Sequence, residues 1–199
     1  MFPASFKEMV RKSLNRAALK QSAKVIVGAG KTKHDGWASA EIFEVNITDR
    51  NDFANYWSPN SRECFLAEHV WEHLTAEEGQ TAANLCFEFL APGGRLRIAV
   101  PDGNSPDPEY IEYVRVGGTG LGADDHKVLY TVESMGEMFK KSGFEVHPVE
   151  YFDVQGQFHQ NEWDEKDGYI SRCRKNDSRN TPELLKYTSL IVDGIKPAS

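Results

Sequence analysis

The sequence lacks the features of membrane-spanning and repetitive proteins. No apolar run approaches the roughly 18 residues that a membrane-spanning helix needs, and the start has no compact apolar stretch of the kind found in signal peptides. No segment repeats and no tract has low complexity, which excludes solenoid folds. We therefore expect a protein that is not exported and has no membrane span.

Cysteine is scarce, and its spacing does not indicate disulfides. The three cysteines are Cys64, Cys86 and Cys173, and none is paired in a Cys-x-x-Cys spacing. An odd number of separated cysteines fits reduced thiols, because cytosolic proteins rarely keep disulfides. We therefore expect a cytoplasmic location.

Positive charge is scarce over most of the chain. The formal net charge is −7, whereas nucleic-acid binding draws its affinity from cations that meet phosphates. We therefore expect no nucleic-acid partner. Residues 1–33 are the exception, with eight Lys or Arg against one acid, Glu8. A basic helix over about residues 6–20 could touch an anionic membrane, an acidic substrate or RNA, but a solvated helix is the simpler interpretation.

The order of apolar runs predicts one α/β domain. The length of 199 residues suits a single domain, and no break in composition divides it. Helices are expected over residues 75–90, where Thr75 and Glu78 form a capping-box pattern, and over 132–141. Strands are expected over residues 24–27, 38–41, 43–47, 63–67, 95–100, 144–152 and 187–195. Strands that alternate with helices indicate an α/β sheet.

A glycine turn follows the first strand, in the segment VIVGAGK. Gly28 and Gly30 lack a Cβ, so the backbone can approach a ligand closely. A dinucleotide fingerprint requires Gly or Ala three positions after the second glycine, where Lys33 stands, so nicotinamide or flavin binding is less favoured. Glu41 ends the next strand and could accept hydrogen bonds from both hydroxyls of a ribose. An ordinary surface carboxylate is the alternative for Glu41.

The segment EHVWEHL matches the H-x-x-E-H pattern of zinc proteases through His69, Glu72 and His73. If the following helix begins at Thr75, both histidines lie in the turn between strand and helix and do not share a helix face. We therefore expect no metal site, and we interpret the segment as the edge of a ligand crevice at the carboxyl end of a strand. The alternative is that these side chains only cap the turn and fill space.

Four motifs together resemble the small, predicted S-adenosylmethionine-dependent methyltransferases of class I. They are VIVGAG, GWASAE, FLAEHVWEHL and FEFLAPGGRLRIAVPD, in that family's order and spacing. Residues 124–196 are similar to the family's second half. The resemblance implies a single-domain Rossmann-like sheet with helices on both faces and an antiparallel last strand. It divides the chain into a basic helix (1–22), a cofactor-binding half (24–102) and a substrate-side half (103–199) with a polar insert (153–186).

The resemblance also implies S-adenosylmethionine as the cofactor and a place for each of its parts. The methionine moiety would lie on the turn of Gly28, Ala29 and Gly30, and the ribose on Glu41. The remaining implied contacts are Asn46 and Ile47 at the adenine, and Glu68 and His69 beside the transferable methyl.

Methyl transfer from a sulfonium is an in-line displacement, so the protein mainly positions the acceptor, and only a hydroxyl or amine acceptor needs a base. We select His126 as candidate base, because an unperturbed imidazole has a pKa of about 6.5 and Asp124 and Asp125 could orient it. His69 is the second candidate for a catalytic role. A loop histidine bonded to the backbone is the alternative for His126.

The leading hypothesis is methyl transfer to a small-molecule or glycan-type acceptor. The rivals are a non-catalytic methyltransferase-like binding module and, less favoured, a zinc hydrolase that uses HVWEH. The glycine-rich loop 117–127 and the insert 153–186 are expected to close over the acceptor, with Trp163 and Tyr169 excluding water. The sequence predicts no oligomeric state.

Overall fold

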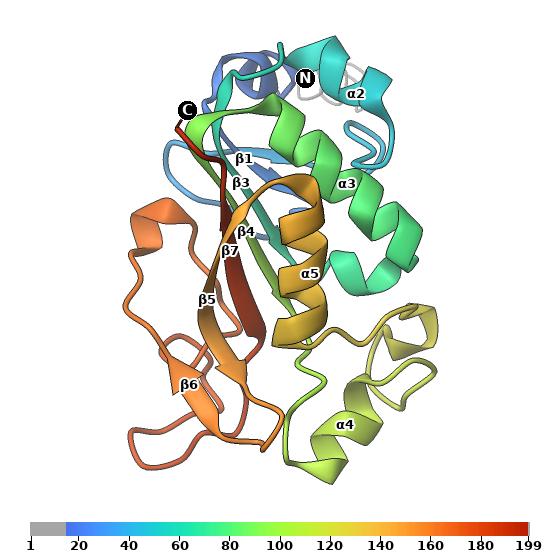
Figure 1. The fold of residues 1–199 in the computed structure, drawn as a ribbon, viewed down its shortest axis with the longest axis vertical. Helices are drawn as coiled ribbons and strands as arrows, with labels where there is room; N and C mark the ends of the chain where they lie inside the picture. The colour runs from blue at the N-terminus through green and yellow to red at the C-terminus, as the bar shows by residue number, and fades with distance from the viewer. Residues whose placement is uncertain (1–14, 199) are drawn as a thin grey trace, which may run out of the picture.

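A seven-stranded mixed sheet forms the centre of the computed structural model, which describes residues 15–198 (Figure 1). The spatial order of the strands is β2-β1-β3-β4-β7-β5-β6. The four strands from β2 to β4 pair in parallel, while β7 runs antiparallel to β4 and β5. The bounds are β1 Lys24–Val27, β2 Ala38–Ala40, β3 Arg62–Glu68, β4 Leu90–Val100, β5 Glu145–Phe152, β6 Phe158–Gln160 and β7 Leu190–Ile195. The predicted α/β sheet with an antiparallel last strand is confirmed.

Three helices, α2 (Arg50–Tyr56), α3 (Ala76–Phe89) and α5 (Val132–Ser142), pack on one face of the sheet. Their aromatic side chains Phe53, Phe89 and Phe139 are fully buried there. The helix α4 (Pro108–Val114) lies beyond the carboxyl end of β4 (Figure 1). Residues 15–21 are helical, and the rest of the expected basic helix lies outside the described residues. None of the helices described is long and apolar enough to cross a membrane.

The helix after the histidine segment begins where its capping box predicts. The Thr75 side chain accepts a hydrogen bond from the Glu78 amide at 3.2 Å, and the Glu78 carboxylate accepts one from the Thr75 amide at 2.8 Å. This reciprocal pair satisfies two backbone donors that a helix start leaves open. The segment before it is a short 3-10 turn, η1 (Trp71–His73).

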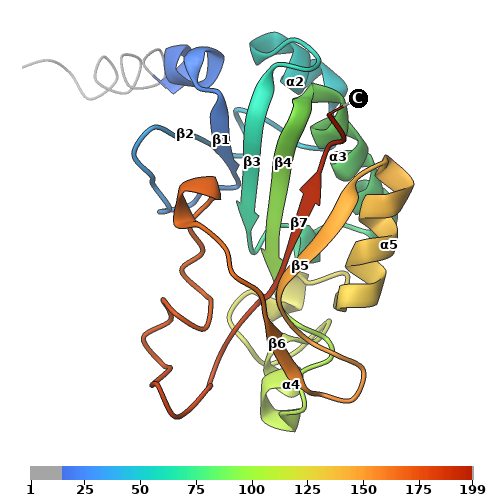
Figure 2. The same ribbon diagram turned by 60° about the vertical axis from the view of Figure 1, so that its left-hand side comes forward.

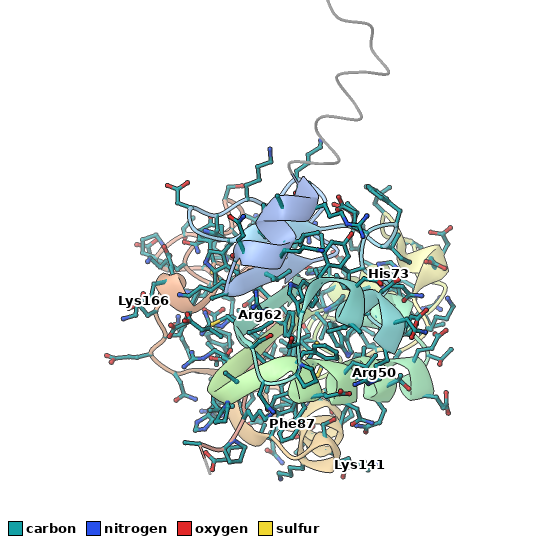
Figure 3. All side chains as sticks on the ribbon, turned by 90° about the horizontal axis from the view of Figure 1, so that it is seen from above. Arg50, Arg62, His73, Phe87, Lys141 and Lys166 are labelled. Carbon is teal, nitrogen blue, oxygen red and sulfur yellow. The ribbon has the colours of Figure 1, made fainter. Side chains whose placement is uncertain are left out.

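The insert, residues 153–186, covers the second face of the sheet (Figure 2). Seen from above in Figure 3, Arg50 of α2 and Lys166 of the insert lie on opposite sides of the molecule. Ile170 and Cys173 of the insert are fully buried against strand residues such as Leu66. Between residues 15 and 198 no α-helix packs on this face, so the expected helices are present on one face only. The insert contains one 3-10 turn, η3 (Glu165–Asp167), and otherwise lacks the apolar periodicity of a helix.

A buried arginine on β4 fastens the insert to the sheet. Arg97 is 0% exposed, and its Nε donates to Asp193 Oδ1 of β7 at 2.7 Å. Its Nη1 donates to the backbone carbonyls of Asp164 at 3.2 Å and Gly168 at 2.6 Å, both in the insert. Trp163, which was expected near the acceptor, instead packs on this guanidinium, with 4.8 Å between the Cζ atom and the ring centroid. The Asp164 carbonyl also accepts from the Asp167 amide of η3 at 3.1 Å, whereas no backbone amide among the described residues donates to the Gly168 carbonyl, which the arginine therefore satisfies.

A buried glutamate on β5 also holds the insert to the sheet, by accepting hydrogen bonds from insert residues. Glu150 is 0% exposed and accepts hydrogen bonds from Thr188 Oγ1 at 2.6 Å and the Arg174 amide at 2.7 Å. The Gln160 side chain donates to its other oxygen at 3.1 Å. A buried carboxylate is tolerated when several donors replace its lost water. These hydrogen bonds hold the insert against the sheet.

The expected strand over residues 43–47 is wrong. The amides of Glu44 and Val45 both donate to the Glu41 carbonyl, at 2.8 and 2.9 Å, which forms a tight turn after β2. Asn46 Oδ1 then accepts from the Thr48 amide at 3.0 Å. Such local side-chain hydrogen bonds give the backbone an alternative to a strand ladder. The alternation of apolar residues is misleading here, because Phe43 is 72% exposed. The short helices α2 and α4 were also not predicted.

We expect Arg97→Met to lower the free energy of unfolding by about 3–5 kcal/mol, the range for removing one partner of a buried ion pair. The matched control is Arg95→Met, because Arg95 contacts the same Asp193 carboxylate but its side chain is 28% exposed. Its loss should be about 1 kcal/mol or less. Urea unfolding of both variants measures this difference, and equal losses would contradict the role given to Arg97.

The buried carboxyl group of Asp102 makes the free energy of unfolding depend on pH. Its buried carboxylate accepts from the amides of Asn104 at 2.9 Å and Phe152 at 2.8 Å, and burial raises its pKa from 3.8 to about 6. Because the folded pKa is the higher one, this group's contribution is fully present below pH 4 and is lost as pH rises to about 6. The shift corresponds to about 2–3 kcal/mol. Urea unfolding from pH 4 to 7 should show that loss in the native chain and not in Asp102→Asn. The same pH slope in both proteins would contradict the assignment.

Candidate functional site

The carboxyl ends of three neighbouring parallel strands, β2, β1 and β3, lie side by side at one end of the sheet. Gly28 follows β1, Glu41 follows β2, and His69 follows β3. Ligands of open α/β sheets bind at this end, because loops diverge there and leave a crevice. Two adjoining clefts open at it, with volumes of about 480 and 670 Å³. Both are lined by Gly28, His69 and His73.

The smaller cleft, here called the Glu41 cleft, contains five of the predicted cofactor residues. They are Gly28, Glu41, Asn46, Ile47 and His69. Its other walls include the apolar side chains of Val45, Val70 and Leu74. The sequence analysis did not identify these apolar residues. Val45 follows Glu41 within the same loop, and Val70 and Leu74 follow the end of β3, and these positions are the signal that could have identified them.

The glycine turn is required by its backbone and by its neighbour. Gly28 has φ +59°, and a Cβ at this position would lie 2.5 Å from Val70 Cγ2. Gly30 has φ +54°. The Thr32 amide closes the turn by donating to the Ala29 carbonyl at 2.7 Å. A left-handed conformation together with a side chain packed on the backbone explains why glycine occupies position 28.

Two polar groups of the Glu41 cleft have no hydrogen-bond partner within residues 15–198. No hydrogen bond between described residues uses the Glu41 carboxylate. The backbone amide of Glu41 donates to Glu44 Oε2 at 3.0 Å. Asn46 uses Oδ1 for Thr48, and no hydrogen bond between described residues uses its side-chain NH₂. The cleft therefore offers a carboxylate acceptor beside an amide donor.

His69 is held in one orientation by the protein. Its φ is +56°, a conformation that residues with a Cβ seldom adopt and that is frequent at functional sites. Its Nε2 lies 3.1 Å from Ser189 Oγ, with which it forms a hydrogen bond, and its Nδ1 lies 2.9 Å from Glu72 Oε1. His69 and His73 lie on either side of the start of η1 and share no helix face. The prediction that the H-x-x-E-H pattern falls in a turn is confirmed.

The larger cleft, here called the His126 cleft, adjoins the glycine turn. It is lined by Ala29, Gly30, Glu68, Glu72, Leu121, His126, Tyr169 and Arg172, among others. His126 Nδ1 lies 2.7 Å from the Val114 carbonyl. A carbonyl can only accept, so Nδ1 carries a hydrogen, and in the neutral ring Nε2 has the lone pair.

Asp125 does not orient His126 as the sequence suggested. Its Oδ2 lies 3.3 Å from His73 Nδ1, and the Val114 carbonyl orients His126 instead. The rings of His73 and His126 meet edge to face, with centroids 4.9 Å apart. The structure thus brings together two histidines that are 53 positions apart in the printed sequence.

Glu68 connects the site to the insert. Its carboxylate accepts from Ser171 Oγ at 2.7 Å and from the Arg172 amide at 2.8 Å. Glu68 was predicted to contact the cofactor, and it lines the His126 cleft while it holds the insert in place. Tyr169 and Arg172 of the insert line this cleft.

The cysteine thiols and the Tyr130 hydroxyl stay protonated near neutral pH. Burial raises the pKa of Cys64 and Cys173 to about 11, so neither thiol is a thiolate nucleophile near neutral pH. Burial and the nearby Glu72 carboxylate raise the pKa of Tyr130 to about 12, so this hydroxyl stays neutral. Acid–base chemistry in this region therefore falls to carboxylates and imidazoles.

Comparisons with known proteins extend over nearly the whole chain. A S-adenosylmethionine-dependent methyltransferase from Archaeoglobus fulgidus is 14% identical, with a TM-score of 0.51 over 95% of this chain and 94% of that one. One from Thermotoga maritima is 12% identical, with a TM-score of 0.52 over 96% of each chain. An O-methyltransferase family protein from Burkholderia thailandensis is 11% identical, with a TM-score of 0.53 over 96% of this chain and 57% of that one.

No protein-family model matches the chain, and no curated protein matches it. The likeness to solved structures is distant in sequence and concerns the arrangement of strands and helices. The chain has the fold of the class I, S-adenosylmethionine-dependent methyltransferases.

Proposed function

We propose that this protein transfers a methyl group from S-adenosylmethionine to a small-molecule or glycan-type acceptor. The observation that carries the proposal is the Glu41 cleft. A carboxylate after β2, which accepts no hydrogen bond from the described residues, and a positive-φ glycine turn after β1 line the same space there. A fold alone does not establish a function, so the proposal rests on the residues of this site.

The chain offers a partner for each part of the cofactor. The glycine turn over residues 28–30 presents backbone to the methionine moiety. The Glu41 carboxylate accepts hydrogen bonds from the ribose hydroxyls, and the Asn46 NH₂ group donates to the adenine. Ile47, Val70 and Leu74 give the adenine apolar walls. When bound, S-adenosylmethionine supplies a methyl group on a positively charged sulfur.

The acceptor would bind in the His126 cleft, which meets the cofactor cleft at Gly28, His69 and His73. His126 is positioned to accept a proton from a hydroxyl or amine, because its Nδ1 is fixed by Val114 and its Nε2 lone pair is free. Tyr169 and Arg172 restrict the approach of the acceptor from the insert side.

A non-catalytic binding module is the competing function. Calorimetry with S-adenosylmethionine and S-adenosylhomocysteine separates the two, because an enzyme must bind both substrate and product cofactor. Failure to bind either would leave the fold without the proposed activity.

We expect Gly28→Val to abolish binding of S-adenosylhomocysteine, because the side chain collides with Val70 and forces the turn out of its left-handed conformation. The matched control is Gly36→Val. Gly36 also has a positive φ, +81°, but has open space around its Cβ position and lies outside both clefts. Both variants carry the backbone strain, and only the first should lose the ligand. Normal binding by Gly28→Val would place the cofactor elsewhere.

Glu41→Ala should weaken S-adenosylhomocysteine by about 1.5–3 kcal/mol, the range for hydrogen bonds to a charged group, and Glu41→Gln should lose less. Glu63→Ala is the control, since Glu63 lies near the amino end of β3, whereas the clefts lie at the carboxyl ends of the parallel strands. Titration calorimetry measures all three. Unchanged affinity in both Glu41 variants would make Glu41 an ordinary surface carboxylate.

A further inference from the structure

Three metal-binding side chains converge at the border of the two clefts. One carboxylate oxygen of Glu72 and one ring nitrogen each of His73 and His126 lie within 4.8 Å of one another. They come from η1 and from the loop after η2 (Ala123–Asp125), so only the folded chain brings them together. Two imidazoles and one carboxylate form a donor set that binds zinc and other divalent first-row metals.

Glu72 is the unusual member of this group. It is 1% exposed, and neither of its carboxylate oxygens has an aligned hydrogen bond with a described residue. His69 Nδ1 lies 2.9 Å from Oε1, but its ring N–H is not aligned with that oxygen. Burial of a carboxylate without aligned donors is unfavourable unless a cation compensates its charge.

The two imidazoles are prepared to act as ligands. His126 donates its Nδ1 hydrogen to the Val114 carbonyl at 2.7 Å, so in the neutral ring Nε2 is the nitrogen with the lone pair. Metal-binding histidines almost always donate their other nitrogen to a carbonyl or carboxylate in this way. His73 Nδ1 is buried and has no aligned hydrogen bond among the described residues. The Asp125 carboxylate, 3.3 Å from that nitrogen, adds negative charge at the edge of the group.

We propose that Glu72, His73 and His126 bind one divalent transition-metal ion, with zinc the best match to two histidines and one glutamate. Bonds of about 2.0–2.2 Å place tetrahedral ligand atoms about 3.4 Å apart, so rotation of the side chains must bring these atoms closer by up to about 1.4 Å. The His126 cleft leaves a coordination position open, where water or an acceptor oxygen binds.

This site differs from the zinc-protease pattern of the sequence. His69 lies outside this group of mutually close ligand atoms, and His126 takes its place from a distant loop. The proposal replaces the expectation, made from sequence alone, that the chain has no metal site. It does not depend on methyl transfer. With the ion bound, His126 would be its ligand and not the base. The ion would lower the pKa of a bound acceptor hydroxyl, and water would take up the released proton.

The test is titration of chelator-treated full-length protein with ZnCl₂, followed by calorimetry, and with CoCl₂, followed by visible absorption. One Zn²⁺ per chain should bind, and Co²⁺ should give the absorption of a site with nitrogen and oxygen ligands. Glu72→Gln and His126→Ala should each weaken Zn²⁺ binding by more than about 100-fold, beyond the effect of altering a residue that only orients a ligand.

Two further variants keep the test decisive. His73→Ala removes a half-buried ligand with little risk to folding, in case Glu72→Gln does not fold. His147→Ala, at an exposed histidine on β5, is the matched control and should bind Zn²⁺ as the native chain does. Absence of stoichiometric binding, or equal binding by the native chain and the three site variants, would overturn the proposal. Loss of Zn²⁺ with unchanged S-adenosylhomocysteine affinity would support the metal site independently of the cofactor site.

Discussion

The buried Arg97, paired with Asp193 in the sheet, holds the insert on the sheet through its hydrogen bonds to two insert carbonyls. Arg97 lies in the centre of the sheet and faces a layer in which the described residues form no α-helix. Its guanidinium bonds to a carboxylate of β7 and to two carbonyls of the insert. An irregular segment covering a sheet face carries many backbone groups that need partners. Buried charges on the strands supply them, which is why the polar insert can replace helices here.

The same principle extends from the fold to the site. Glu68 ends β3 and holds the insert by its carboxylate, while the next residue, His69, carries the left-handed turn that separates the two clefts. Ser189, just before β7, contacts the His69 ring. One wall of the His126 cleft is therefore built by the insert, and the histidine between the clefts is positioned by the sheet. A substitution that weakens the contacts between insert and sheet would therefore alter the shape of the His126 cleft.

The sequence predicts most of the parallel half of the structure, and the reasons are physical. Capping at Thr75 and Glu78 is local, so it fixed the start of α3 and the turn that contains the histidines. The glycine turn and Glu41 follow strand ends directly, so their meeting follows from parallel pairing. Pairings across the chain were not accessible in this way: Arg97 with Asp193, or Glu72 with His126, depend on how loops return to the sheet. The exposed Phe43 shows that alternation without burial also misleads.

The position of β7 has a consequence for how the protein is made. This last strand is inserted between β4 and β5, both of which are synthesised before it. Until it leaves the ribosome, β4 and β5 each have an open edge, Arg97 has no carboxylate partner, and the insert has no complete surface to cover. Unpaired edges and exposed apolar strands are the features that attract chaperones and promote association of nascent chains. The central layer of this molecule is thus completed by its final strand, so a ribosome that stalls before Asp193 would hold a chain with its buried charge still in water.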